Sequence, residues 1–206
     1  YLHCQQLVAQ AEEAERALQR LKQEPSGHLR MALPFSVDDS WATAVLSGFL
    51  AKYPKISVEA TLRPGGVDPD DETMDVVFSF GARPETHHPV IPLGTPHIGL
   101  FASPRYLQRA GVPQSPADLS QHEMVRLTTL PMEVYSPPLL QGLTLNYRVT
   151  TNELLMARLT CADGLGIAWL PLISCQRFVK QGTLVPLMPE LHYPLPLWLI
   201  YRSANR

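Results

Sequence analysis

The sequence is poor in charged residues and in cysteine, and each shortage excludes a class of protein. Charged residues make up 17% of the chain and the formal net charge is −2, whereas soluble domains carry roughly 25% charged residues. Nucleic-acid binding needs clustered Lys and Arg, so this segment is not expected to hold DNA by itself. Cys4, Cys161 and Cys175 form no C-x-x-C pair, which argues against a disulfide framework and a zinc site.

Long apolar runs and a secretion signal are missing as well. No stretch approaches the ~20 apolar residues of a membrane span, and the N-terminal segment is Glu-rich and amphipathic, unlike a signal peptide. We therefore expect reduced thiols, a cytoplasmic location and no membrane partner. The 20 prolines separate periodic segments and form no tract, so they punctuate a fold and do not indicate disorder.

The first 24 residues have the pattern of one helix. Small and apolar side chains follow at alternating spacings of four and three, typical of the a/d seam of a coiled coil. The members of this predicted dimerisation seam are Cys4, Leu7, Ala11, Ala14, Leu18 and Leu21. An amphipathic helix packed on its own domain would give a similar pattern over so short a length. Pro25 and Gly27 end the helix.

Beyond residue 27 the sequence alternates between strand and helix patterns, which predicts an α/β fold with open parallel sheets. In the first part, strands are expected at 28–33, 56–62 and 75–80. A helix from about 40 to 52 is capped by Asp38, Asp39 or Ser40 and has Trp41, Val45 and Phe49 on one face. Further strands are expected at 97–102, 124–128, 143–149, 167–170, 183–187 and 195–201. Helical segments are expected at 104–110, 115–122, 172–180, and from a Thr151 or Asn152 cap to about 162.

Several motifs follow one another in a fixed order along the chain. They are GHLR at 27–30, FLAKYP at 49–54, DVVFSFG at 75–81, ASPRYL at 102–107, GVP at 111–113, PADL at 116–119, GLGIAWLP at 164–171 and GTLV at 182–185. Each motif is weak alone, but the ordered set resembles the regulatory half of LysR-type transcriptional regulators from residue 27 to about residue 201.

This resemblance implies two Rossmann-like lobes of the periplasmic-binding-protein type II kind, crossed twice by the chain and preceded by an amphipathic linker helix. Residues 1–26 would be the C-terminal part of the linker helix. Residues 27–95 and 194–206 would form lobe I, and residues 96–193 would form lobe II. The family's N-terminal winged helix-turn-helix, through which it binds DNA, and its closing C-terminal helix are expected to be absent from this chain.

The resemblance also implies a function: a ligand-sensing and oligomerisation domain, not an enzyme, that binds a small effector between its lobes. The partners implied are an unidentified effector, a second copy in a homodimer or homotetramer, and DNA only through the absent domain. Two departures affect the site. Pro64, Gly65 and Gly66 make the family's short helix between 62 and 75 unlikely to form fully, and Phe80 replaces the usual polar residue before Gly81.

Ligands of open α/β sheets bind beyond the carboxyl ends of the strands. The candidate effector-binding residues at these positions are Pro34, Phe35, Ser36, Arg63, Gly81, Ala82, Arg83, Thr128, Thr129 and Leu130. Ser36 and Thr128 would donate hydrogen bonds, although a capping role is an equal alternative. Arg63 or Arg83 would hold a carboxylate, although a solvated rim position is an equal alternative.

Aromatic side chains near these strand ends bear on the kind of ligand. Phe35, Phe80, Phe101 and Trp169 would either line the site or pack in the core. If they line it, the effector is aromatic or apolar with one anionic group.

Other constellations do not indicate a metal, a cofactor or catalysis. The acidic residues between 68 and 75 lack the glycine and distal glutamate of a calcium loop, and the adjacent His87 and His88 lack metal-ligand spacing. Gly164 and Gly166 follow a helix and precede a strand, the reverse of a dinucleotide loop, so they read as a helix stop. A solute-binding protein remains the alternative function; a secretory signal upstream would favour it.

Overall fold

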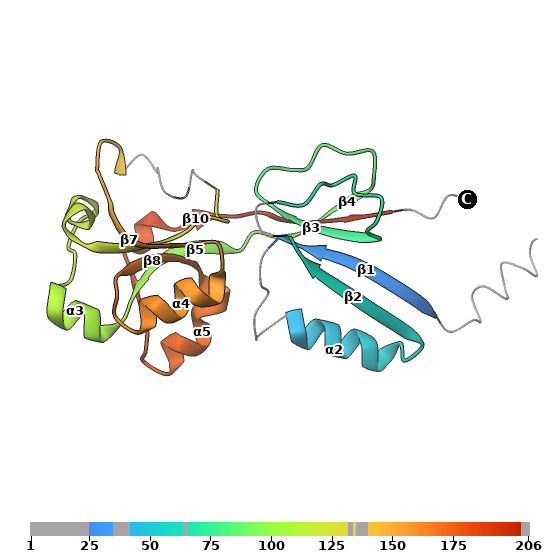
Figure 1. Cartoon of the computed structure of the whole chain (residues 1–206), viewed down its shortest axis with the longest axis horizontal. Helices are drawn as coiled ribbons and strands as arrows, with labels where there is room; N and C mark the ends of the chain where they lie inside the picture. Colours follow the sequence, from blue (N-terminus) through green and yellow to red (C-terminus); the bar gives the residue numbers. More distant parts are fainter. Residues whose placement is uncertain (1–24, 35–41, 64–65, 132–133, 135–139, 203–206) are drawn as a thin grey trace, which may run out of the picture.

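The computed structural model describes residues 25–34, 42–63, 66–131, 134 and 140–202. The predicted seam from Cys4 to Leu21 lies outside the described residues. Phe35, Ser36, Trp41 and the proposed caps between 38 and 40 also lie outside them. Figure 1 shows two α/β lobes side by side. Two segments of the chain, which we call the crossings, connect one lobe to the other.

Lobe I is built on a five-stranded sheet with the order β2-β1-β3-β11-β4. Its strands are β1 (Gly27–Leu33), β2 (Ile56–Leu62), β3 (Val76–Phe80), β4 (Val90–Gly94) and β11 (Leu197–Tyr201). β1 is parallel to β2 and β3, whereas β11 is antiparallel to β3 and β4. The helix α2 (Ala42–Lys52) lies below β1 and β2 in Figure 1.

The inner face of α2 differs from the predicted one. Val45 is 62% exposed, whereas Leu46, Phe49 and Leu50 are half-buried. These three follow the i, i+3, i+4 spacing of a single helix face, which turns Val45 toward solvent. Phe49 also contacts the ring of Tyr53, with 5.2 Å between ring centroids.

Lobe II is built on a six-stranded sheet with the order β10-β5-β8-β6-β7, and β9 also pairs with β5. Its strands are β5 (His97–Ala102), β6 (Glu123–Leu127), β7 (Asn146–Thr151), β8 (Ile167–Pro171), β9 (Val185–Leu187) and β10 (Tyr193–Pro194). Its helices are α3 (Pro104–Ala110), η1 (Pro116–Gln121), α4 (Leu154–Ala162), α5 (Leu172–Lys180) and η4 (Pro189–Leu191). Both sheets are mixed, not purely parallel as predicted, because β5 and β11 run antiparallel to their neighbours.

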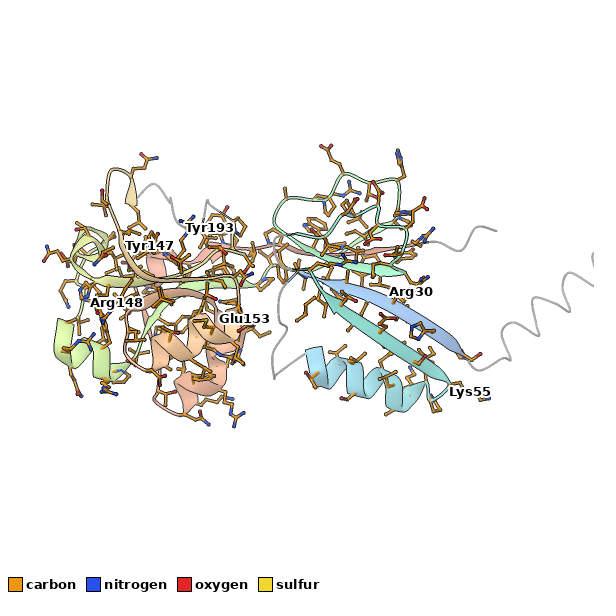
Figure 2. The ribbon with its side chains drawn as sticks, viewed as in Figure 1. Arg30, Lys55, Tyr147, Arg148, Glu153 and Tyr193 are labelled. Carbon is orange, nitrogen blue, oxygen red and sulfur yellow. The ribbon has the colours of Figure 1, made fainter. Side chains whose placement is uncertain are left out.

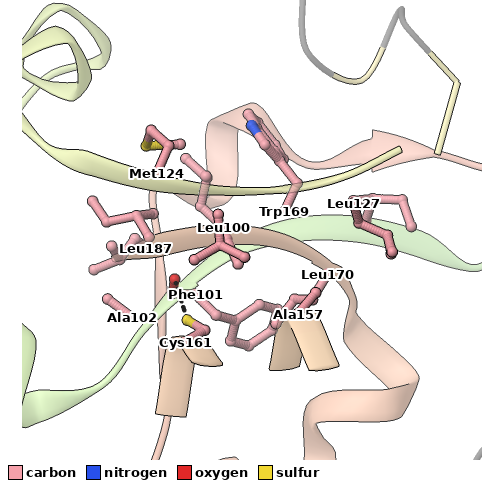
Figure 3. Packing of buried hydrophobic residues seen from close by; sticks show 14 of the residues in the cluster. Leu100, Phe101, Ala102, Met124, Leu127, Ala157, Cys161, Trp169, Leu170 and Leu187 are labelled. Carbon is pink, nitrogen blue, oxygen red and sulfur yellow. Dashed lines mark hydrogen bonds between the residues drawn. The ribbon is translucent and has the colours of Figure 1, made fainter. Parts of the chain in front are cut away.

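The main hydrophobic core belongs to lobe II. Phe101 points from β5 toward α4, where its carbonyl oxygen accepts a hydrogen bond from Cys161 Sγ at 3.2 Å, and Trp169 points to the opposite face of the sheet (Figure 3). Phe101 is 2% exposed and Trp169 is fully buried, so both pack in the core. Lobe I has a much smaller core of Ala32, Met74, Val77 and Ile200.

Helix ends in lobe II follow local chemistry. Ser103 Oγ accepts a hydrogen bond from Tyr106 N at 3.2 Å, and Gly111 ends α3 with φ of 86°, as predicted. Gly164 follows the end of α4 with φ of 84°. The predicted caps Thr151 and Asn152 are wrong, because the side chain of Glu153 accepts from Met156 N at 2.7 Å and caps α4.

Gly166 allows two backbones to approach closely at the start of β8. A Cβ atom at this position would lie 2.5 Å from the carbonyl oxygen of Glu123, which is too close for any real contact. We expect Gly166→Ala to lower the free energy of unfolding by about 1–3 kcal/mol, as overpacked sites do. Gly48→Ala is the control. Gly48 lies within α2 with open space around it, so this change should stabilise by about 0.5–1 kcal/mol. Urea unfolding measures both, and a Gly166→Ala protein as stable as the wild type would contradict the close approach.

His122 is buried beneath α3 and is expected to make stability depend on pH. Tyr106 Oη lies 3.0 Å from His122 Nδ1 and accepts from Glu123 N at 2.9 Å; when the imidazole is neutral with Nδ1 unprotonated, the hydroxyl donates to it. Burial lowers the pKa of His122 and outweighs the opposing charge of Asp118. An unfolded histidine takes up its proton near pH 6.5, whereas the folded one does so only at lower pH. The free energy of unfolding should therefore fall as the pH is lowered through about 6.5.

The variant His122→Asn separates this effect from other titrations, since its amide oxygen can still accept from Tyr106. Chemical unfolding between about pH 7.5 and pH 5.5 should show a smaller loss of stability in the variant than in the wild type. Equal slopes in the two proteins would show that His122 is not the group responsible.

Candidate functional site

The carboxyl ends of the parallel strands gather at one edge in each lobe. In lobe I, β1, β2 and β3 are parallel, so Leu33, Leu62 and Phe80 end at the same edge. In lobe II, β6, β7 and β8 are parallel, so Leu127, Thr151 and Pro171 share an edge. Such edges are where open α/β sheets bind ligands.

The two crossings of the chain bring these edges toward each other. The chain leaves lobe I at Gly94, which pairs with Leu197, and Leu197 also pairs with Phe80 at the carboxyl end of β3. It enters lobe II at β5, where Ile98 pairs with Pro171 at the carboxyl end of β8. Both crossings therefore connect carboxyl edge to carboxyl edge, and the two lobes meet at this junction (Figure 1).

Lobe I places its predicted site residues after three strands. Pro34 is buried after β1, and Arg63 N donates to Leu33 O at 2.8 Å, which ties the ends of β1 and β2 together. The exposed guanidinium of Arg63 lies 3.7 Å from Asp71 Oδ2. Gly81 follows β3, with Ala82 and Arg83 exposed beyond it. Two cations, Arg63 and Arg83, thus lie on the lobe I side.

In lobe II the three residues after β6 have different roles. Thr128 is exposed, but its Oγ1 and its N both donate to Thr151 O, at 3.3 and 2.8 Å. It therefore joins β6 to β7, a structural role rather than the predicted free donor. Thr129 Oγ1 is buried and has no hydrogen-bond partner among the residues that the structure describes, which costs about 1–3 kcal/mol unless something satisfies it. Leu130 is 4% exposed and belongs to the core.

Glu153 is a functional candidate that the sequence reasoning missed. It follows the carboxyl end of β7 and lies on the side of lobe II that faces lobe I (Figure 2). Its carboxylate occupies the N-terminus of α4, the end of a helix that favours negative charge. The signal was a carboxylate between a strand and a helix, which is a favoured capping position. An anionic ligand would be repelled here, so α4 does not offer its N-terminus to one.

Aromatic residues contribute to the junction less than the sequence suggested. Phe80 is half-buried and packs against the core of lobe II, although it belongs to a strand of lobe I. Phe101 and Trp169 are core residues, as described above. Tyr147 and Tyr193 lie on the face of the lobe II sheet away from α4 and α5 (Figure 2), and the guanidinium of Arg126 lies 5.5 Å from the Tyr147 ring centroid.

The acidic segment after β2 is held by partners within lobe I. Asp75 Oδ2 accepts from Arg30 N at 2.8 Å, and this bond lowers the pKa of Asp75. Asp71 Oδ1 accepts from the hydroxyl and the N of Thr73, which lower the pKa of Asp71. Across the residues that the structure describes, no group of His, Cys, Asp or Glu is placed to hold a metal ion.

Neither cysteine in the described part of the chain is poised as a nucleophile. Cys161 and Cys175 are fully buried. Burial raises the pKa of Cys175 to about 12, and it also raises the pKa of Cys161. A reactive cysteine needs a thiolate, so both thiols serve packing. None of the described helices is long and apolar enough to cross a membrane.

Comparison with known proteins identifies relatives of one kind. A family model described as the LysR substrate binding domain matches residues 22–206. An uncharacterized HTH-type transcriptional regulator of Escherichia coli K12, YhjC, is 34% identical over 85% of the chain and 61% of its own length. An HTH-type transcriptional regulator of Xanthomonas campestris is 34% identical over 61% of the chain and 36% of its own length. The chain thus spans less than two thirds of each of these two relatives.

Solved structures of LysR-type regulators have a similar fold. The regulatory domain of CrgA, a LysR-type regulator from Neisseria meningitidis, has a TM-score of 0.75 at 22% identity, covering 87% of this chain and 90% of that one. The full-length virulence activator AphB of Vibrio cholerae has a TM-score of 0.73 at 24% identity, covering 98% of this chain and 71% of that one. At these identities the likeness shows the two-lobed fold, and the relatives are transcriptional regulators, not enzymes. The chain belongs to the family of LysR substrate-binding domains.

Proposed function

We propose that this chain senses a small molecule that binds at the junction between its lobes and thereby controls transcription by a longer LysR-type regulator. One observation carries the proposal: both crossings join carboxyl edge to carboxyl edge, so the ligand-binding edges of two sheets flank one junction. A molecule held there would touch both lobes, and a ligand that binds one lobe arrangement better than another shifts the equilibrium toward it.

The charges around the junction support an effector with an anionic group that faces lobe I. Arg63 and Arg83 lie on the lobe I side, whereas Glu153 places a carboxylate on the lobe II side. Arginine pairs with carboxylates through two parallel hydrogen bonds. The buried hydroxyl of Thr129 lacks a partner within the described part of lobe II. We therefore propose an organic carboxylate that carries a hydrogen-bonding group at its other end.

We also propose that the chain functions in the cytoplasm and that it controls DNA binding by the longer regulator. The two relatives described above carry HTH in their names and are longer than this chain. In a regulator of that length, the sensing domain would reposition DNA-binding modules paired through the linker helix. Ligand affinity and the DNA-competent arrangement would then influence each other reciprocally.

A ligand panel tests the proposed effector class. We expect small organic carboxylates to raise the melting temperature, whereas their uncharged amides, sugars and cationic amines do not, because only the carboxylates pair with Arg63 or Arg83. Thermal shift followed by calorimetry measures this. Stabilisation by sugars or cations alone would contradict the proposed class.

Variants connect that binding to the junction. Arg83→Gln should weaken the best carboxylate by roughly 10- to 100-fold, the loss of a charge-assisted hydrogen bond of about 1.5–3 kcal/mol. Arg63→Gln is the parallel variant. Arg105→Gln is the matched control, because Arg105 is exposed on α3 in lobe II, away from the strand carboxyl ends. If neither junction variant weakens binding, the ligand does not use this site.

Self-association is proposed to use the seam from Cys4 to Leu21, with α4 as a second surface. Leu155, Met156 and Leu159 expose 42, 52 and 44% of their surface on that helix, and a second copy of the chain would cover them.

Sedimentation of the chain with and without residues 1–24 tests the seam, and Met156→Glu in each form tests α4. We expect a smaller species without residues 1–24. An unchanged oligomer after this deletion would show that the seam is only a connector.

A further inference from the structure

The two crossings form one continuous ribbon, not two separate linkers. In lobe II, Ile98 pairs with Tyr193 and His97 with Pro194; in lobe I, Gly94 pairs with Leu197. Gly94 and His97 are separated by as many residues as Pro194 and Leu197. The antiparallel register is therefore kept across the junction. The hydrogen bond from Leu195 N to Pro96 O, at 2.8 Å, lies within this register.

Prolines weaken the ribbon at the junction itself. Pro96 has no N–H to donate, so it cannot return the hydrogen bond that its carbonyl oxygen accepts from Leu195 N. Among the described residues, the bond from Leu195 to Pro96 is the backbone hydrogen bond found between the two crossing segments. On the other side of that segment, Pro196 O accepts from Gly81 N at 2.9 Å, which extends the pairing of β3 with β11 by one residue, and Pro196 has no N–H to return to Gly81 O. The ribbon is therefore least supported where the lobes meet, and part of its hydrogen bonding goes to the loop after β3.

Gly81 is held at this place from both of its backbone polar groups. Its N–H donates to Pro196 O, and its carbonyl oxygen accepts from Trp198 Nε1 at 3.0 Å. Its φ of 97° is a backbone conformation that residues other than glycine rarely adopt. The preceding residue, Phe80, packs against the core of lobe II. The loop that carries Ala82 and Arg83 is thus fastened directly to the crossing ribbon.

We propose that Gly81 and Trp198 form a latch that fixes the angle between the lobes by bracing the crossing ribbon at Pro196. Trp198 acts as a positioning residue, because it holds Gly81 and does not need to touch a ligand. A molecule that contacts Ala82 or Arg83 would displace the loop after β3. Because this loop is hydrogen-bonded to the crossing ribbon at Pro196, the displacement would change the angle between the lobes. This regulatory step rests on the proposed function, whereas the mechanical role of the latch does not.

The latch predicts a change in inter-lobe distance that is measurable without any ligand. Spin labels at Ala51→Cys in α2 and Lys180→Cys in α5 report that distance, because both positions are exposed and lie in different lobes. The background carries Cys4→Ser, and the buried thiols of Cys161 and Cys175 resist labelling. Trp198→Phe removes the indole N–H, and we expect pulsed electron–electron spectroscopy to give a displaced or broader distance distribution.

Two matched controls separate the latch from general destabilisation. Tyr201→Phe also changes an aromatic polar group on β11, but at the end of the strand away from the junction. Gly81→Ala should act like Trp198→Phe, whereas Gly111→Ala introduces similar backbone strain (φ of 86°) at the end of α3, outside the junction. Circular dichroism confirms folding of each variant before labelling.

The outcomes decide the inference. A displaced or broadened distribution in Trp198→Phe and Gly81→Ala, with Tyr201→Phe and Gly111→Ala unchanged, supports the latch. Distributions that match the wild type in both junction variants, or equal changes in the controls, overturn it. The ligand panel is measured separately with the wild type. A failed latch with intact carboxylate binding is therefore distinguishable from failure of the proposed effector site.

Discussion

The architecture depends on the antiparallel pairing that continues from one lobe to the other. Because Gly94 pairs with Leu197 in lobe I, and His97 with Pro194 in lobe II, the chain must cross twice at the same place. This constraint puts the carboxyl edges of both sheets against one junction. It also forces the late strand β11 into the sheet of lobe I, where it separates β3 from β4.

The lobes differ in how they are stabilised. Lobe II has an extensive core between its sheet and helices, whereas in the described part of lobe I the core cluster is four buried residues with Val67 and Val90 packed against them. Small cores bury too little apolar surface to be very stable alone. Phe80 of lobe I packs on the core of lobe II, so lobe I depends on the junction for part of its support. A binding event at the junction therefore acts on the less stable half of the molecule.

Much of the fold was predictable because local chemistry determined it. The alternation at 28–33 and 56–62 gave β1 and β2, and Ser103, Pro104 and Gly111 defined both ends of α3. The sequence did not predict β4, because it contains Pro92 and a proline argues against a strand. Proline is tolerated there because β4 lies at the edge of its sheet. The mixed sheets could not be predicted, since strand direction in β5 and β11 follows from the crossings and not from local pattern.

The candidate site was predictable as a set of chain positions but not as chemistry. The rule that ligands bind beyond strand ends located Arg63, Arg83 and the residues after β6. Whether a hydroxyl there is free depends on tertiary contacts: Thr128 bonds to Thr151 of β7, whereas Thr129 has no partner in the regions described above. The carboxylate of Glu153 is a local helix cap, so its position between a strand and a helix could have indicated it. The bonds of Gly81 to Pro196 and Trp198 join segments far apart in sequence, so no local pattern indicates them.

We propose that a ligand occupies the junction where the two carboxyl edges meet. A crystal structure of the chain with the carboxylate that gives the largest thermal shift tests it most directly. We expect the carboxylate to lie within hydrogen-bonding distance of Arg63 or Arg83, with the rest of the molecule reaching Thr129. Ligand found only on the outer faces of the lobes, with the junction empty, would contradict it.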